Sequence, residues 1–138
     1  MSTVIKVSIK GFQKELEVKG GLTFSYNSSA NVTNPSNNAK ITFGPVQVSS
    51  FQFAVMEPDE KDVQALIKWL VEHKVNDEVK FVIRDREFDA SPREIVLTHA
   101  CLTSYTEAIS EDGSDINLEI VGQTVKIGDV KVEQHTQR

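Results

Sequence analysis

Few residues of this chain have types and spacing that could do chemistry. His99 and Cys101 are two positions apart, so on a strand their side chains would share one face. A Cys–His pair can form a nucleophilic thiolate. The alternation also places both beside Leu97, on the face predicted to be buried, where a cysteine usually behaves as a small hydrophobic residue. We therefore expect structural roles for the pair and predict no catalytic residue.

Metal ligands and phosphate-binding loops are the next candidates, and the sequence favours neither. His73, His99 and His135 lie far apart, and a single cysteine leaves no paired thiolates for a zinc site. The Gly20-Gly21 pair lacks the GxxxxGK[ST] or GxGxxG context of a phosphate loop. The carboxylates concentrate in turns, where solvated charge accounts for them. We predict no metal and no cofactor, and we expect a protein that is not an enzyme.

The composition indicates one globular domain spanning residues 1–138. Fifteen basic residues against twenty acidic ones give a net charge of −5, which argues against a nucleic-acid partner. The single cysteine excludes an internal disulfide. The first residues lack the pattern of a secretory signal, and no apolar run approaches the roughly 20 residues of a membrane span. We expect synthesis in the cytoplasm and no direct membrane insertion.

The elements that carry these residues are mostly predicted strands. Apolar residues recur at every second position, as in residues 5–9 and 79–83, which is typical of strands with one buried face. Eight or nine short strands at this spacing favour a closed barrel or a sandwich. The predicted fold class is mainly β: a small β-barrel of about eight or nine antiparallel strands with one α-helix.

One segment, at about residues 59–74, has the periodicity of a helix. It opens with Pro58-Asp59-Glu60, which places acidic side chains at the positive end of the helix dipole. Trp69 lies beside its apolar stripe, and we expect this side chain to pack in the core rather than to bind a ligand. The stripe consists of Val63, Leu66, Ile67, Leu70 and Val71.

A polar, uncharged stretch separates the early strands. Residues 20–39 contain no charged residue, and nine of the twelve residues from Asn27 to Asn38 are Ser, Thr or Asn. An extended loop at about 27–40 is long for a hairpin connection, and such loops are often functional. It is either a surface loop or a docking arm, whose lack of charge lowers the desolvation cost of burial against a partner. Its candidate interface residues are Asn27, Ser28, Ser29, Asn31, Val32, Thr33, Asn34, Pro35, Asn37 and Asn38.

The order of the elements carries a resemblance. A hairpin start leads into the loop at 27–38, one helix follows in mid-chain, and residues 94–105 and 116–128 read as the closing strands. This order resembles the Hcp family, also called TssD, the tube subunits of type VI secretion systems, which are related to phage tail-tube proteins. The similarity covers most of the chain.

The resemblance implies a structural role. Members of that family form hexameric rings that stack into the inner tube of a contractile injection system, with the extended loop contacting the next ring. Sheath proteins, a spike protein and effectors carried to target cells would be its partners. The protein would reside in the cytoplasm before firing and then be secreted without a signal peptide.

Two other functions stay open at this point. A monomeric small-ligand-binding β-barrel would hold a guest in its apolar interior. An enzyme using His99 and Cys101 is the third possibility. Within the first class, the sequence does not separate a type VI tube from a phage or extracellular injection-system tube.

Overall fold

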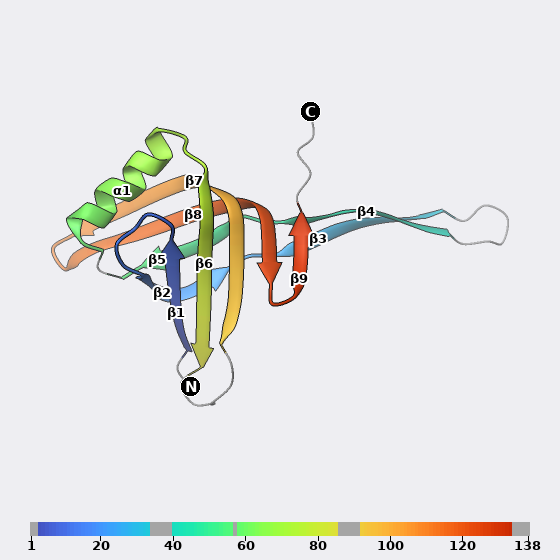
Figure 1. Cartoon of the computed structure of the whole chain (residues 1–138), viewed down its shortest axis with the longest axis horizontal. Helices are drawn as coiled ribbons and strands as arrows, with labels where there is room; N and C mark the ends of the chain where they lie inside the picture. The colour runs from blue at the N-terminus through green and yellow to red at the C-terminus, as the bar shows by residue number, and fades with distance from the viewer. Residues whose placement is uncertain (1–2, 34–39, 57, 86–91, 134–138) are drawn as a thin grey trace.

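The computed structural model describes residues 3–33, 40–56, 58–85 and 92–133. These residues form nine strands and one helix, shown in Figure 1. In chain order they are β1 (Thr3–Ile9), β2 (Leu16–Thr23), β3 (Tyr26–Thr33), β4 (Lys40–Val48), β5 (Phe51–Val55), α1 (Glu60–Val71), β6 (Asn76–Asp85), β7 (Arg93–Ser110), β8 (Gly113–Ile127) and β9 (Val130–Glu133).

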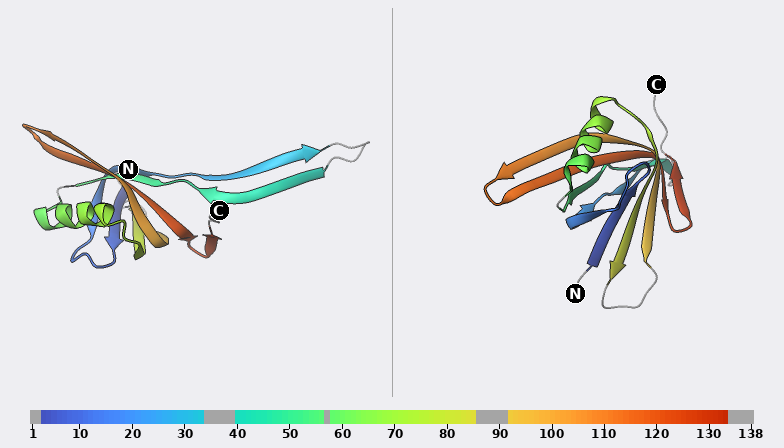
Figure 2. Two further views of the ribbon diagram at one scale, coloured as in Figure 1. Left: turned by 90° about the horizontal axis from the view of Figure 1, so that it is seen from above. Right: turned by 60° about the vertical axis from the view of Figure 1, so that its left-hand side comes forward.

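Six of the strands close into an antiparallel barrel. Their order is β5-β2-β1-β6-β7-β8, and pairing of β5 with β8 closes the ring. Strand β9 extends the sheet beyond β8, while β3 and β4 pair only with each other and project from the barrel (Figures 1 and 2). The predicted mainly β fold with a barrel and one helix is confirmed, with six strands in the barrel and three outside it.

The barrel interior is filled by side chains. The inward positions of the barrel strands are apolar and inaccessible to solvent, and Phe51 and Phe81 are the largest of them. Phe51 stacks on Phe81 at 5.5 Å between ring centroids, and Phe24 stacks on Phe51 at 4.6 Å. Burying each such side chain stabilises the fold by roughly 1.5–3 kcal/mol. The apolar side chains at every second position of the barrel strands therefore pack against one another inside the barrel.

The helix packs against β7 and ends three residues earlier than expected. Asp59 is its N-cap, and the Asp59 carboxylate accepts a hydrogen bond from the backbone N–H of Asp62 at 2.9 Å. At the other end His73 adopts a left-handed conformation (φ 52°), and its N–H donates to the Leu70 carbonyl. The Lys74 N–H donates to the Trp69 carbonyl, which completes a Schellman motif. This turn ends the helix at Val71.

The buried face of the helix is rotated from the predicted stripe. Leu66 and Trp69 are buried, whereas Ile67 and Val71 are exposed. Trp69, expected in the core, buries its ring, and its indole N–H donates to the Lys74 carbonyl at 2.8 Å. The large apolar area of the Trp69 ring favours this rotation.

Candidate assembly interface

The His99–Cys101 pair is not arranged as predicted. Leu97 and Ala100 are both buried, so the inward positions of β7 change from odd to even residue numbers at His99. His99 is exposed with φ 49°, and Cys101 is half-buried. The expectation that both share the buried face with Leu97 is therefore wrong. The left-handed residue interrupts the alternation.

The bend of the barrel wall explains this change. Thr98 pairs with Thr124 and Ala100 pairs with Gly122, while His99 and Gln123 between them form no ladder pair. Both strands thus turn a corner without a shift in register. Among the described contacts, no hydrogen bond joins His99 to Cys101, so the geometry offers no thiolate-forming pair.

Metal and membrane sites receive no support from the described parts of the chain. Residues 3–33, 40–56, 58–85 and 92–133 contain no group of three or more His, Cys, Asp or Glu side chains able to hold a metal ion. Within the same ranges, no helix is long and apolar enough to cross a bilayer.

The stretch expected as an extended polar loop is a two-stranded ribbon in its described part, and we call β3 and β4 together the arm. Residues 27–33 lie in β3 and residue 40 in β4, paired antiparallel from Tyr26↔Val48 to Thr33↔Lys40. The predicted interface residues Asn34, Pro35, Asn37 and Asn38 lie outside the described residues. Those that are described, Asn27, Ser28, Ser29, Asn31, Val32 and Thr33, all lie on β3 and are exposed.

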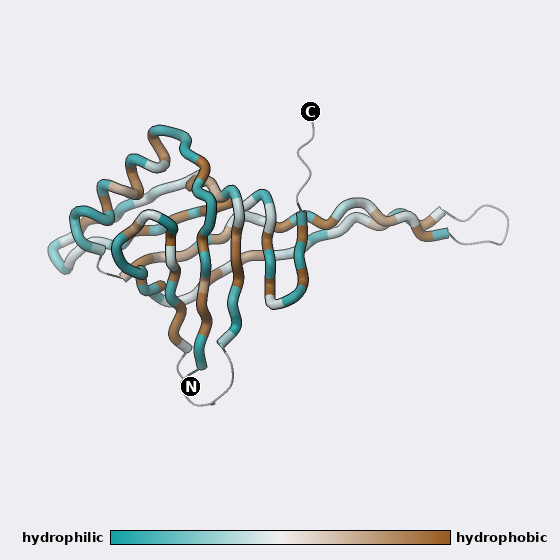
Figure 3. Tube along the Cα trace, viewed as in Figure 1, coloured by the Kyte–Doolittle hydropathy of each residue, from teal (hydrophilic) through white to brown (hydrophobic). Residues whose placement is uncertain are grey.

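One face of the arm is apolar and uncovered. Val32 lies opposite Ile41, and Ala30 lies opposite Phe43, so the period of two places these side chains on one face. Phe43 is 72% exposed, Val32 67% and Ile41 54%. Figure 3 shows the apolar positions recurring along the projecting ribbon. The opposite face presents polar residues, such as Asn31 paired with Thr42.

The apolar residues of β4 were missing from the predicted interface. Ile41 and Phe43 alternate with polar residues in the sequence, so they were assigned to a strand without being given a binding role. The sequence signal for this face was the uncharged polar stretch that precedes β4. A strand paired only with such a stretch would have no second layer to cover its apolar side chains. Half of the candidate surface therefore comes from a segment that the polar composition did not mark.

A bulge divides the arm into a base and a tip. The register shifts between Ser28 and Ala30, opposite Gly44 and Pro45. A Cβ atom on Gly44 would overlap the Ser29 hydroxyl, so any larger residue there would force the Ser29 side chain to move. The Ser28 hydroxyl donates to the Gly44 carbonyl at 3.3 Å. Bulges increase the local twist of a ribbon, so this joint sets the direction of the arm tip.

Two hydrogen bonds join the two chain segments at the arm base, between the arm and the barrel strands. The Ser25 N–H donates to the Ser49 hydroxyl at 2.8 Å, and the Ser49 N–H donates to the Ser25 carbonyl at 2.9 Å. Strand β9 also contacts β4. The arm is thus held at its root and uncovered along its length.

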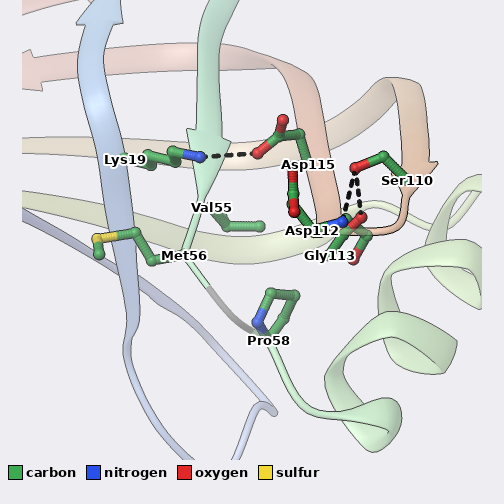
Figure 4. A pocket seen from close by; sticks show the side chains of 9 residues that line it. Lys19, Val55, Met56, Pro58, Ser110, Asp112, Gly113 and Asp115 are labelled. Atoms are coloured by element: carbon green, nitrogen blue, oxygen red, sulfur yellow. Dashed lines mark hydrogen bonds and ion pairs between the residues drawn. The ribbon is translucent and has the colours of Figure 1, made fainter.

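The β7–β8 hairpin projects from the opposite end of the molecule (Figure 2). Ile109 near its tip is 78% exposed. Between this tip and the β2 and β5 strands lies a cavity of about 330 Å³, which we call the end cavity (Figure 4). The Lys19 ammonium pairs with the Asp115 carboxylate across it at 2.8 Å. Its lining residues are Lys19, Val55, Met56, Pro58, Ser110, Asp112, Gly113, Ser114 and Asp115.

A second group of charges lies at the start of α1. The Lys14 ammonium lies 3.0 Å from a carboxylate oxygen of Asp59 and 3.8 Å from Asp62. Burial, followed by the charge of Asp59, raises the pKa of Asp62, whose Oδ2 is buried without a hydrogen-bond partner. The hydrogen bond from the Asp62 N–H, followed by the Lys14 ammonium, lowers the pKa of Asp59. The pKa values of these two neighbouring carboxylates are thus shifted in opposite directions.

A third surface is a groove of about 530 Å³ on the outer face of the barrel. Lys6, Glu15 and Glu17 converge on it from β1 and from the region of β2, together with Arg84 and Glu94. Its charges are of both signs, as expected of a solvated wall. The outward polar residues of the first strands therefore share one surface.

A six-stranded barrel with one covering helix and a long two-stranded arm defines the Hcp-like fold. The Hcp1 structure from Salmonella typhimurium matches with a TM-score of 0.64 and 17% identity, covering 91% of this chain and 85% of that one. Hcp1 from Flavobacterium johnsoniae matches with a TM-score of 0.66 and 15% identity, covering 95% and 99%.

A third match is to a chain of a prophage baseplate. A chain of the anti-feeding prophage baseplate has a TM-score of 0.59 and 14% identity, covering 91% of each chain. No protein-family model and no curated protein matches this chain. At these identities the likeness concerns the fold, and the predicted resemblance to Hcp proteins is confirmed at that level.

Proposed function

We propose that this protein is a structural subunit whose hexameric rings stack into the inner tube of a type VI secretion system or a related contractile injection system. The observation that carries the proposal is the arm, a ribbon with an uncovered apolar face. Two-stranded ribbons are marginally stable alone in water. The arm therefore needs a covering surface, and in a tube a second copy of the chain supplies it.

The charge of the arm supports burial in an assembly. Lys40 is the one charged residue from position 20 to position 56. Burying the arm against another subunit therefore costs little charge desolvation, while its aliphatic and aromatic side chains contribute the hydrophobic gain. A large exposed apolar surface with such composition is typical of a protein–protein interface.

The packed barrel disfavours the small-ligand alternative. A guest-binding barrel needs an interior space, whereas the described inward positions are filled by Phe51, Phe81 and their neighbours. The cavities described above lie at the surface. The third alternative, an enzyme, rested on the His99–Cys101 pair, whose predicted arrangement is wrong.

The remaining partners follow from the proposed role. Effectors would travel in the lumen of the tube, a sheath would surround it and a spike protein would cap it. The subunit would be stored in the cytoplasm and leave the cell when the machine fires. Because tube subunits act by assembly, the protein itself would have no catalytic activity and need no cofactor.

Solution mass tests the proposal most directly. Light scattering on a sizing column should give six times the monomer mass, and negative-stain images of that peak should show rings with a central hole. A monomer that persists at high concentration would overturn the proposal and favour the ligand-binding barrel.

A paired substitution then tests the arm. Phe43→Ser removes an exposed apolar side chain and should abolish ring stacking. Thr42→Ser, on the polar face of the same strand, is the matched control and should stack like the parent. Equal stacking by both variants would remove the arm from the assembly interface.

A further inference from the structure

The surface that receives the arm must be a different part of the same chain. A contact that repeats head-to-tail joins two unlike patches, whereas a two-fold contact joins identical ones. The arm and the β7–β8 tip, which borders the end cavity, lie at opposite ends of the long axis (Figure 2). Resting on the proposed tube function, we infer that the arm of one subunit docks into the end cavity of the next.

The end cavity is lined by both apolar and polar side chains. Val55, Met56 and Pro58 form one side of it, and the β7–β8 tip forms the other (Figure 4). Met56 is 43% exposed, and Ile109 is more exposed still. The exposed parts of Met56 and Ile109 are the apolar complement for Phe43, and docking would cover them together with the apolar face of the arm. Val55 is already buried within the chain, and the remaining lining of the end cavity is mostly polar.

The charges of the two surfaces are also complementary. Lys40 lies in the distal part of the arm. The rim of the end cavity carries Asp112 and Asp115, and Glu111 lies in the same turn. Lys19 neutralises Asp115 within the chain, at 2.8 Å, which leaves acidic charge beside it to attract the arm lysine. Such charges guide association and register more than they add affinity.

A second surface groove, although more apolar, fits less well by its charge. A groove of about 230 Å³ beside the end of α1 is lined by Phe12, Trp69 and Val75. Its rim carries three lysines, Lys10, Lys68 and Lys74. Lys10 pairs with Asp77, and both Lys68 and Lys74 pair with Glu72, so three cations against two anions leave this rim with an excess of one positive charge. That excess would repel Lys40, whereas the acidic rim of the end cavity attracts it. Charge therefore favours the end cavity as the receiving surface.

Cysteine crosslinking tests the contact in the assembled protein. In a Cys101→Ser background, one preparation carries Phe43→Cys and a second carries Met56→Cys. After mixing, assembly and oxidation, a crosslinked dimer of the two variants should form, because a disulfide requires Cβ atoms roughly 3.5–4.5 Å apart. Imaging of the same mixture reports whether rings and tubes are present.

Three control pairs locate the contact. Thr42→Cys, on the opposite face of the arm, should crosslink to Met56→Cys far less than Phe43→Cys does. A strong crosslink between Phe43→Cys and Val71→Cys would place the arm on the helix and overturn the inference. Self-crosslinking of Phe43→Cys alone would show paired arms, which also overturns it.

The outcomes separate this inference from the proposed function. Rings or tubes that form without a Phe43–Met56 crosslink would leave the tube function intact and refute the end cavity as the receptor. Absence of any ring would refute the tube function itself. A charge exchange provides a second readout: Lys40→Glu should weaken stacking at low salt, and Asp112→Lys in the same chain should restore it.

Discussion

The barrel and the arm use the same period-two patterning with opposite results. In the barrel, Phe51 and Phe81 are inaccessible to solvent because the closed sheet supplies a facing layer. In the arm, Phe43 and Val32 occupy equivalent alternating positions and remain exposed, because the ribbon has no second layer. Alternation alone therefore tells which residues share a face. The topology decides whether that face is covered within the chain or left exposed.

The largest expected contrast compares two phenylalanines. Phe51→Ala opens a cavity in the barrel and should lower the free energy of unfolding by about 3–5 kcal/mol. Phe43→Ala removes an exposed side chain, so the stability of the monomer should change by less than about 0.5 kcal/mol. The same variant should lose the stacking of rings that the arm is proposed to mediate. Urea denaturation at a concentration where the parent is monomeric, paired with sedimentation at high concentration, measures both effects.

This comparison has a clear failing outcome. If Phe43→Ala destabilises the monomer as much as Phe51→Ala does, the arm is covered within its own chain and the proposed interface is wrong. If Phe43→Ala leaves both stability and assembly unchanged, the apolar face of the arm has no role in subunit contacts.

The barrel was predictable from the sequence because its signals are local and repeated. Alternation in residues 5–9 and 79–83 marks buried faces regardless of which strands pair. The helix was also predictable, although His73 ends it in a left-handed turn that no periodicity reveals. Pairing partners were not predictable, since the closure of β5 on β8 depends on long-range contacts.

The candidate interface was predictable only in part. The uncharged composition of residues 20–39 marked one strand of the arm, but the apolar contribution of Ile41 and Phe43 depends on their cross-strand register with β3. The change of the inward positions of β7 from odd to even residue numbers at His99 was also not predictable. It arises where β7 and β8 turn a corner together. Both misses concern geometry between strands, which single-strand alternation does not encode.

A smaller effect on assembly would show whether the direction of the arm matters in addition to its apolar face. Gly44→Ala leaves the apolar face unchanged but drives a methyl group into the Ser29 hydroxyl. We expect an unchanged barrel and about tenfold weaker assembly, which corresponds to roughly 1.4 kcal/mol. Sedimentation across a concentration series measures this shift.

The matched control for the bulge is a compensating change. Ser29→Ala removes the hydroxyl that the new methyl group meets, so the double variant Ser29→Ala/Gly44→Ala should regain most of the assembly. Assembly of Gly44→Ala at the strength of the parent would show that the twist at the bulge does not aim the arm.

In the acidic range, two carboxylates at the start of α1 make the stability depend on pH. The raised pKa of Asp62 means that the folded state holds its proton more tightly, so its contribution to stability is present at low pH and declines as the pH rises above the usual carboxyl range. The lowered pKa of Asp59 acts in the opposite sense, and its contribution is lost as the pH falls through the carboxyl range.

Two variants separate these opposite contributions. Relative to the parent, Asp62→Asn should become progressively more stable as the pH rises from about 4 to 7. Asp59→Asn should become progressively less stable relative to the parent as the pH rises from about 2 to 4, where the carboxylate of the parent ionises. Thermal unfolding at several pH values measures both slopes. Slopes of the same sign would show that the two carboxylates do not titrate in different environments.

The smallest expected effect concerns the turn that ends α1. His73 occupies the left-handed region at φ 52°, where a residue with a Cβ loses about 1–2 kcal/mol. Glycine relieves this strain but adds roughly 0.5–1 kcal/mol of unfolded-chain entropy, so His73→Gly should stabilise the monomer by no more than about 1 kcal/mol. Glu72→Gly is the control, because Glu72 lies at φ −85° and gains no such relief. Urea denaturation should therefore shift in opposite directions for the two variants, and a loss of stability in both would mean that the His73 side chain contributes more than its backbone strain costs.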